Sequence, residues 1–148
     1  MLFRSIYPEE SEKAAHFIQL CNRQDTPLLF LQNITGFIVG SDFEKAGIIK
    51  KGSQLINAIS NSTVPHITVI VGNSYGAGNY GMSGREYRNR FTFLWPTAKI
   101  AVMGPKQIAG VMSIVRRARA ARKGEEFDEE ADAEIVRQVE EKIGRAHV

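Results

Sequence analysis

The sequence predicts an α/β fold in which helices cover a parallel sheet. Two apolar runs of strand length, 28–31 and 67–71, flank a segment with helical periodicity, and this strand–helix–strand order implies a parallel pair. Of the 148 residues, 43% are hydrophobic and 24% are charged, and the net charge is +3, which excludes an intrinsically disordered chain. No apolar run approaches the roughly 20 residues that cross a bilayer. We therefore expect one soluble domain without a membrane partner.

The first expected helix begins at Pro8. Proline lacks the N–H that would be unpaired in a first turn, and the two glutamates that follow meet the positive end of the helix dipole. The helix continues to Cys21, which we expect to be an inert core thiol, and its apolar face comprises Ala14, Phe17, Ile18 and Cys21. The run 28–31 that comes next is continuous and apolar, which is typical of a strand covered on both faces.

The best-marked helix begins at Ser41. Ser41 and Glu44 form an S-x-x-E capping box, in which each side chain bonds to the backbone of the other residue. We expect the helix to end at Asn61, and its apolar face comprises Ile48, Gly52, Leu55 and Ile59. The run 67–71 is rich in β-branched residues and predicts a second buried strand that ends at Gly72.

The C-terminal part predicts two short strands followed by two helices. The strands, at 93–95 and 100–103, are separated by a proline. The first helix begins at Pro105 and ends before Gly124, and its apolar stripe comprises Ile108, Val111, Met112 and Val115. Asp128 is expected to cap the last helix, which has an apolar side made of Ala131, Ile135 and Val139.

Opposite charges are segregated in this C-terminal part. Five basic residues lie between Arg116 and Lys123, and seven acidic residues follow between Glu125 and Glu134. A phosphate-binding face would gain little beside such a countercharge, although the chain as a whole is basic. We expect a solvated helical hairpin or a dimer contact here, and no nucleic-acid partner.

The residue types that usually bind metals are few. His16, His66 and His147 are scattered, and with one cysteine the zinc-binding patterns fail, so we expect no metal to be bound by this chain. Cys21 alone cannot form an intramolecular disulfide, and the N-terminus lacks a basic segment followed by an apolar one. The expected compartment is therefore the cytoplasm, or the mitochondrial matrix if the source is a eukaryote.

The most informative stretch is the glycine-rich segment 72–82 (GNSYGAGNYGM), directly after the second strand. Its glycines let consecutive backbone N–H groups converge on one negative oxygen, and a helix that begins near Gly78 would strengthen that site. Residues 76–81 also match the dinucleotide motif G-x-G-x-x-G, but no acid lies between Glu86 and Glu125, where that fold needs one. A tight strand-to-helix turn without a ligand is the alternative.

Four segments in this order carry a resemblance to a known family: 15–21 (AHFIQLC), 27–37 (PLLFLQNITGF), 76–82 (GAGNYGM) and 95–104, which runs from Trp-Pro to AVMG. The chain resembles the carboxyltransferase (β) subunits of biotin-dependent acyl-CoA carboxylases, above all the methylcrotonyl-CoA carboxylase type. The resemblance implies a crotonase-like (ClpP/crotonase) stack of ββα units, with residues 1–142 as a partial C-terminal carboxyltransferase domain. Residues 143–148 do not continue the family pattern, and we expect them to be a non-native tail.

The resemblance further implies transfer of a carboxyl group from N-carboxybiotin to an acyl-CoA, which is methylcrotonyl-CoA or a related propionyl, acetyl or geranyl thioester. Such a reaction takes its base from the cofactor and needs preorganised N–H donors for the oxyanions. By motif position, the backbone N–H groups of Ala77 and Gly78 form the oxyanion hole for biotin, and Gly76 shapes the turn. Gly36 and Phe37 line the other side of the biotin pocket.

Tyr80 matches a family position that lines the acyl pocket. The resemblance also implies that biotin is carried on a partner protein or domain, namely a biotin carboxylase or carrier subunit, and that the chain forms a homo-oligomer with sites between subunits. Part of the basic cluster is a candidate contact for CoA phosphates or for the carrier. Because the family's N-terminal domain supplies most acyl-CoA binding, we expect the chain alone to be inactive.

Two alternatives to this function stay open. A crotonase-type CoA hydratase or isomerase shares the fold but commonly needs a carboxylate base, and near the glycine-rich segment only Glu86 offers one. A non-catalytic assembly module would need no cradle of N–H groups. Carboxybiotin-dependent exchange separates these three hypotheses.

Overall fold

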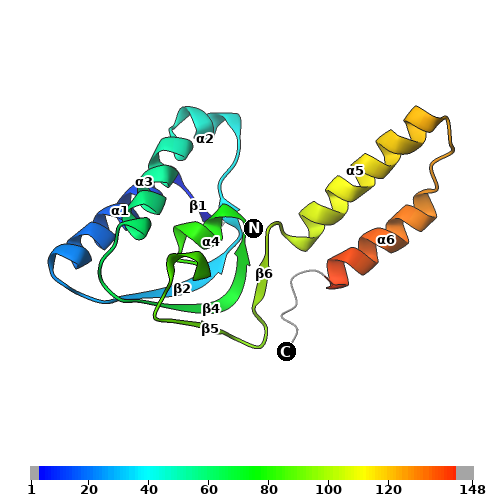
Figure 1. Ribbon diagram of the computed structural model, residues 1–148. Coiled ribbons are helices and arrows are strands. Elements are labelled where there is room, and N and C mark those ends of the chain that lie inside the picture. Colours follow the sequence, from blue (N-terminus) through cyan, green and yellow to red (C-terminus); the bar gives the residue numbers. More distant parts are fainter. Residues whose placement is uncertain (1–3, 143–148) are drawn as a thin grey trace.

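The computed structural model describes residues 4–142 and confirms the predicted α/β class. Its main sheet has four strands, and the other three pair in parallel with the central strand β4 (Figure 1). The strands are β2 (Leu28–Ile34), β4 (His66–Tyr75), β5 (Phe91–Leu94) and β6 (Lys99–Ala101). A second, two-stranded parallel sheet joins β1 (Ser5–Ile6) to β3 (Gly36–Phe37).

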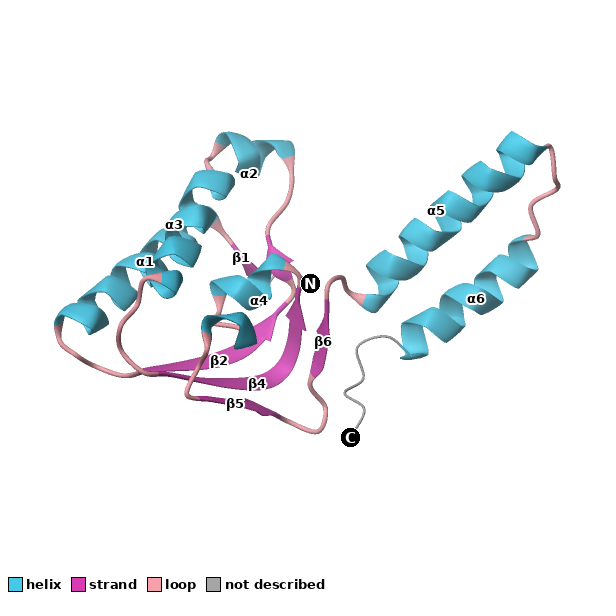
Figure 2. Ribbon diagram, viewed as in Figure 1, coloured by secondary structure: helices cyan, strands magenta, loops and turns pink. Residues whose placement is uncertain are grey.

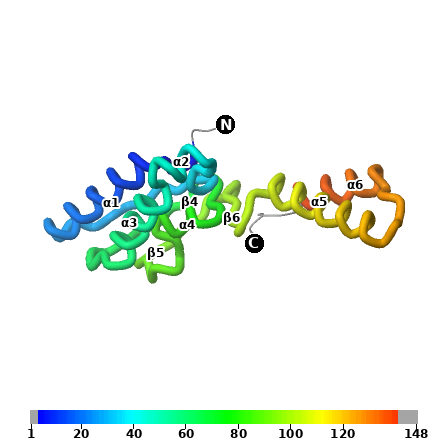
Figure 3. Tube along the Cα trace, turned by 90° about the horizontal axis from the view of Figure 1, so that it is seen from above, coloured from blue at the N-terminus to red at the C-terminus, as the bar shows by residue number. Residues whose placement is uncertain are grey.

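Three helices lie on the same face of the main sheet (Figure 2). They are α1 (Pro8–Arg23), α3 (Ile48–Ser60) and the short α4 (Ala77–Gly81). A 3₁₀ turn, η1 (Arg85–Tyr87), follows α4. The last two helices are α5 (Pro105–Lys123) and α6 (Glu129–Lys142). They form a hairpin that projects from the α/β part, as the view from above also shows (Figure 3). None of the helices described is long and apolar enough to cross a membrane.

The hydrophobic core lies between this helical layer and the sheet. Leu55 of α3 is 1% exposed and Ile18 of α1 is 2% exposed, and both pack with Leu28 and Ile34 of β2. The buried position of Cys21 is confirmed. Phe17, predicted on the apolar face of α1, is 59% exposed, so that prediction is wrong.

The prediction that strand 28–31 is covered on both faces is wrong for the residues described. Burial alternates along β2, and Leu29 and Leu31 are more than half exposed because the helices cover only the opposite face. Phe91 and Phe93 of β5 lie on the same exposed face, since β4 aligns them with the two leucines. Parallel strands usually carry apolar side chains on both faces, and this sheet follows that pattern in composition.

The helix predicted from Ser41 to Asn61 is two helices. The shorter one, α2 (Ser41–Lys45), ends before Gly47, whose φ of 88° lies in the left-handed region and interrupts the helical path before Ile48. Gly40 occupies the N-cap position and no side-chain cap bond forms, so the predicted capping box is also wrong. The predicted apolar face is confirmed for α3, where Ile48, Gly52, Leu55 and Ile59 are buried.

The second predicted strand continues beyond Gly72 to Tyr75. Gln32 is aligned with Ile70 and Ile34 with Ser74, so β4 places three residues opposite Asn33 and bulges there. The Asn33 side chain stabilises the bulge, because its Oδ1 accepts a hydrogen bond of 3.1 Å from the N–H of Asn73. The same amide group occupies the space that a Cβ on residue 72 would need, which explains why a glycine fits inside this strand.

The C-terminal predictions are largely confirmed. The helix from Pro105 ends at Gly124 with a left-handed φ of 68°, and Asp128 caps α6 by accepting a 2.9 Å bond from the N–H of Ala131. The predicted hairpin is held by an ion pair of 2.6 Å between Arg116 and Asp132. The apolar stripe of α5 is mostly exposed in the described part of the chain. The proposed tail at residues 143–148, with His147, lies outside the described residues.

Candidate functional site

The glycine-rich segment turns from β4 into α4 at Gly76. Its φ of 54° is left-handed, and its N–H donates a 3.1 Å hydrogen bond to the carbonyl of Ala101 in β6. Among the residues described, no protein group accepts a hydrogen bond from the N–H groups of Ala77 or Gly78. N–H groups in the first turn of a helix have no intrahelical acceptor and point along its axis. Two neighbouring donors are therefore available where sequence reasoning predicted an oxyanion hole.

The two glycine turns of the predicted biotin site are in contact. A Cβ built on Gly78 would lie 2.9 Å from Cα of Gly36 and 3.0 Å from Cγ1 of Ile34, so only glycine fits without a shift of backbone. Gly36 itself has a φ of +134°, a conformation that residues with side chains rarely adopt. These contacts bring together segments that are about 40 residues apart in the sequence.

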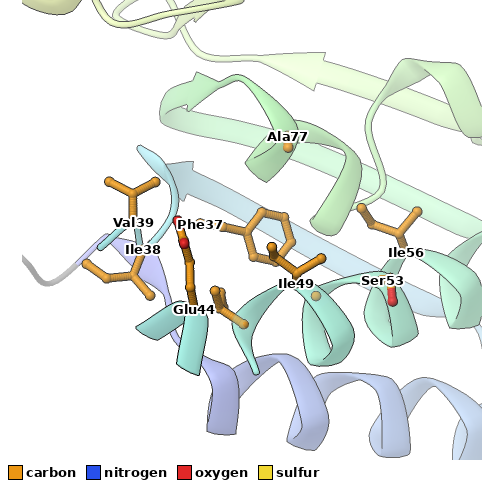
Figure 4. Close-up of a pocket in the computed structure, with 10 residues that line it drawn as sticks. Phe37, Ile38, Val39, Glu44, Ile49, Ser53, Ile56 and Ala77 are labelled. Carbon is orange, nitrogen blue, oxygen red and sulfur yellow. The ribbon is translucent and has the colours of Figure 1, made fainter. Parts of the chain in front are cut away.

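Phe37 follows the turn at Gly36, and its ring lies between α3 and α4, where it lines a pocket. A Cβ on Gly81 of α4 would lie 2.9 Å from its ring, and one on Gly52 of α3 would lie 3.1 Å from it. Beside the ring is a pocket of about 310 Å³, shown in Figure 4. Its walls are mainly apolar and include Phe37, Ile38, Ile49, Ile56 and Ala77. Glu44 is the one carboxylate among its lining residues.

This pocket contains part of the predicted site. Phe37 and Ala77 line it, whereas Gly36, Gly76 and Gly78 lie in the adjoining turns. Tyr80 also lies outside the lining; its ring and that of Tyr87 form a T-shaped pair with a centroid distance of 6.3 Å. Burial, with smaller effects from Glu86 and Tyr80, raises the pKa of the Tyr87 phenol, so this group stays protonated at neutral pH.

A buried chain of polar side chains holds α4 against the sheet, and sequence reasoning missed it. Gln32 and Ser74 are both 0% exposed. Gln32 donates from Nε2 to the carbonyl of Met82 at 2.6 Å and accepts at Oε1 from the Ser74 hydroxyl at 2.7 Å. Asn79 donates to the Ser74 hydroxyl at 2.6 Å. A glutamine within an apolar strand was the available signal, because a buried amide needs partners.

A second buried network fixes the residues that follow α4. The His66 ring contacts the Ser83 hydroxyl through Nδ1 at 2.9 Å and the Ser62 hydroxyl through Nε2 at 2.7 Å. Burial lowers the pKa of His66, so the imidazole is neutral at neutral pH, with one nitrogen donating and the other accepting. Asn89 donates to the carbonyl of Ser83 at 2.7 Å and thereby fixes the turn. His66 has a structural role here and does not line the pocket.

No group of three or more metal-ligating side chains occurs among residues 4–142.

The crotonase-type alternative requires a carboxylate base near the turn. Glu86 is not a lining residue of the pocket, whereas Glu44 is one and comes from α2 and not from the glycine turns. The arrangement therefore offers hydrogen-bond donors and an apolar wall, the two features that suit a cyclic ligand with one polar edge.

Comparisons with known proteins extend over nearly the whole chain. Residues 5–147 match the carboxyl transferase domain model. The chain is 59% identical over 138 residues to a probable biotin-dependent acyl-coenzyme A carboxylase beta2 subunit of Mycobacterium tuberculosis, which covers 93% of this chain and 26% of that protein. It is 51% identical over 125 residues to a probable mitochondrial methylcrotonoyl-CoA carboxylase beta chain of Drosophila melanogaster, covering 84% of this chain and 22% of that one.

The chain also matches solved structures of a carboxylase subunit and of a transcarboxylase. The beta subunit of P. aeruginosa geranyl-CoA carboxylase matches with a TM-score of 0.82 and 44% identity, covering 95% of this chain and 26% of that chain. The transcarboxylase 12S structure described as a hexamer with hydrolysed methylmalonyl-coenzyme A matches with a TM-score of 0.79 and 31% identity, over the same shares. These matches confirm the predicted crotonase-like fold. The chain spans about a quarter of the length of these relatives.

Proposed function

Because this chain belongs to the carboxyl transferase domain family, we propose that it forms the biotin-binding part of a carboxyltransferase that carboxylates an acyl-CoA. The observation that carries this proposal is the pair of available N–H donors at Ala77 and Gly78, next to an apolar pocket lined by Phe37. When bound, carboxybiotin supplies both the carboxyl group and the base that takes the substrate's proton. The chain itself then needs no side-chain nucleophile.

The residues present fit the biotin ring system. Its fused rings are apolar apart from the ureido group, which suits walls made of Phe37 and Ile38 with available N–H donors at the lining residue Ala77 and at Gly78 beside it. The pocket volume of about 310 Å³ is at the lower end of what small-molecule sites require. The carboxylate of Glu44, the one acid among the lining residues, lies on α2 and not in the glycine turns.

The chain's own contribution is to orient and stabilise. The amides of Ala77 and Gly78 would hold the ureido oxygen when biotin is bound, and Gly76 turns the backbone so that both amides are available. Because the contact between Gly78 and Gly36 fixes these donors in advance, they need no reorganisation during the reaction. A preorganised donor of this kind stabilises the transition state by about 3 kcal/mol.

The substrate is an acyl-CoA of the methylcrotonyl class, or a propionyl, acetyl or geranyl relative, with Tyr80 on the acyl side of the site. The partners in this proposal are a biotin carboxylase or carrier subunit and further copies of the carboxyltransferase, which share sites between subunits. The reaction is assigned to the cytoplasm or to the mitochondrial matrix. The relatives compared above are named as carboxylases or as a transcarboxylase, which favours this function over a hydratase, an isomerase or an assembly module.

The substitution Gly78→Val in a full-length β subunit carrying this sequence tests the proposal. A valine side chain would overlap the backbone of Gly36 and displace the amide of residue 78, so carboxyl transfer should fall at least tenfold. Gly110→Val on α5 is the matched control, because the space around Gly110 is open. Carboxybiotin-dependent exchange and size-exclusion chromatography measure transfer and assembly. Undiminished transfer by an assembled Gly78→Val protein would contradict the proposal.

A further inference from the structure

The helix that presents the two donors is too short to hold its own position. With five residues, α4 forms little more than one helical turn, and isolated helices of this length are not stable in water. Its place on the sheet therefore depends on contacts with neighbouring elements. One of these is the close contact between Gly78 and Gly36, and another lies at the opposite end of the helix.

Gln32 links the C-terminal end of α4 to both neighbouring strands. It lies in β2 and is fully buried, and its amide N–H donates to the carbonyl of Met82, the C-cap residue of α4, at 2.6 Å. Its amide oxygen accepts from the Ser74 hydroxyl of β4 at 2.7 Å. Asn79, in the middle of α4, donates to the same hydroxyl at 2.6 Å. One side chain thus connects two strands and the helix.

The pattern of donors and acceptors makes this connection specific. A buried amide that loses a partner keeps the full cost of leaving water, so both ends of the Gln32 side chain have to stay bonded. The bulge of β4 opposite Asn33 aligns Ser74 with Ile34, two positions after Gln32, and so on the same face of the sheet. Asn79 within α4 and Met82 at its C-cap both bond to Gln32, so a shift of the helix would break these hydrogen bonds.

We propose that Gln32 is a positioning residue for carboxyl transfer: by holding Met82, Ser74 and Asn79 it sets where α4 begins and hence where the amides of Ala77 and Gly78 point. This inference rests on the proposed function. Gln32 does not line the pocket and does not touch the reacting atoms. A shift of α4 by about 1 Å would move both donors, and misplacement of this size lowers a rate by up to roughly 100-fold.

The substitution Gln32→Glu tests the proposal through the protonation of one atom. An ionised carboxylate has no proton to donate to the Met82 carbonyl, whereas a protonated carboxyl has one donor and one acceptor and reproduces the amide pattern. In a full-length β subunit we expect kcat to be 10- to 100-fold below wild type at pH 8 and to recover as the pH falls. The KM for acyl-CoA should stay unchanged. Gln32→Met, which cannot form either bond, should lose kcat at every pH.

Binding of free biotin, measured by calorimetry, gives a readout that does not depend on turnover. Gln32→Glu and Gln32→Met should weaken biotin binding about tenfold at pH 8, because the amides of Ala77 and Gly78 have moved. A tenfold change in Kd corresponds to roughly 1.4 kcal/mol of binding free energy. Gln19→Glu on the exposed surface of α1 makes the same chemical change outside the pocket and should leave biotin affinity and kcat unchanged.

The outcomes separate this inference from the proposed function. Wild-type kcat and biotin affinity for folded Gln32→Met would overturn the positioning role, even if Gly78→Val abolishes transfer. If Gly78→Val and both Gln32 variants all keep full transfer, the proposed function fails as well. Should the Gln32 variants not fold, Asn79→Ala removes the bond from α4 to Ser74 and should lower kcat with KM unchanged. Full kcat in Asn79→Ala would then overturn the inference.

Discussion

Replacing Gly78 by alanine measures how tightly α4 is seated on the backbone of β3. The new Cβ would lie 2.9 Å from Cα of Gly36 and 3.0 Å from Cγ1 of Ile34, whereas carbon atoms in contact prefer about 3.5–4.0 Å. The backbone at Gly36 cannot rotate away, so α4 would have to move by about half an ångström or more.

The expected free-energy change has two parts. Alanine is favoured over glycine within a helix by about 1 kcal/mol. Forcing extra volume into a packed site costs about 1–3 kcal/mol, and the upper part of this range applies where the neighbour is backbone. We therefore expect Gly78→Ala to lower the free energy of unfolding by about 1–2 kcal/mol.

Gly81→Ala is the matched substitution on the same helix. Its Cβ would lie 2.9 Å from Cζ of Phe37 and 3.2 Å from Cδ1 of Ile6, and both atoms are side-chain ends, which can shift more easily than backbone. The gain in helix propensity and the cost of this smaller adjustment should cancel to within about 1 kcal/mol. Urea unfolding of the two variants and wild type measures the difference. Equal stability of Gly78→Ala and Gly81→Ala would refute the reasoning from rigid and movable neighbours.

Three further predictions follow from burial and charge. Burial lowers the pKa of His66 below its ordinary value of 6.5, so the unfolded chain binds more protons than the folded one. The free energy of unfolding should therefore fall as the pH drops through 6.5. In urea titrations, His66→Gln should show a weaker dependence of this free energy on pH. Asp132→Ala leaves the partly buried Arg116 without its 2.6 Å partner. Amide hydrogen exchange in α6 should then become at least tenfold faster, while exchange in α1 is unaffected. Equal exchange rates in α6 of wild type and Asp132→Ala would argue against a stabilising ion pair. Leu55→Ala should cost about 3 kcal/mol, against less than about 0.5 for the exposed Ile114→Ala, as measured by denaturation.

Local signals in the sequence were sufficient for many elements of the fold. Pro8 at a helix start, Gly124 at a helix end and Asp128 as a cap were all predicted, because each acts on backbone groups within one turn. The parallel pairing of the two apolar runs also followed from the helical segment between them. The glycine-rich segment indicated available N–H donors, and none of the described residues accepts from Ala77 or Gly78.

The errors arose where a single residue redirects the backbone or a single side chain stabilises it. Helical periodicity continued through Gly47, but the left-handed φ of this residue interrupts the helix and separates α2 from α3. Gly72 looked like the end of a strand, but the side chain of Asn33 stabilises a bulge there and β4 continues. Neither feature leaves a periodic trace, since each depends on one or two residues.

By itself, the sequence determined the order of strands and helices, the core face of α3 and the location of a glycine turn after β4, because hydrophobic period and backbone preference are local properties. Only the tertiary structure decided which groups this turn meets. The contact of Gly78 with Gly36, the ring of Phe37 beside the pocket and the bonds of Gln32 to α4 join residues roughly 40–50 positions apart. Chain connectivity does not predict such meetings; the packing of helices on one face of the sheet does.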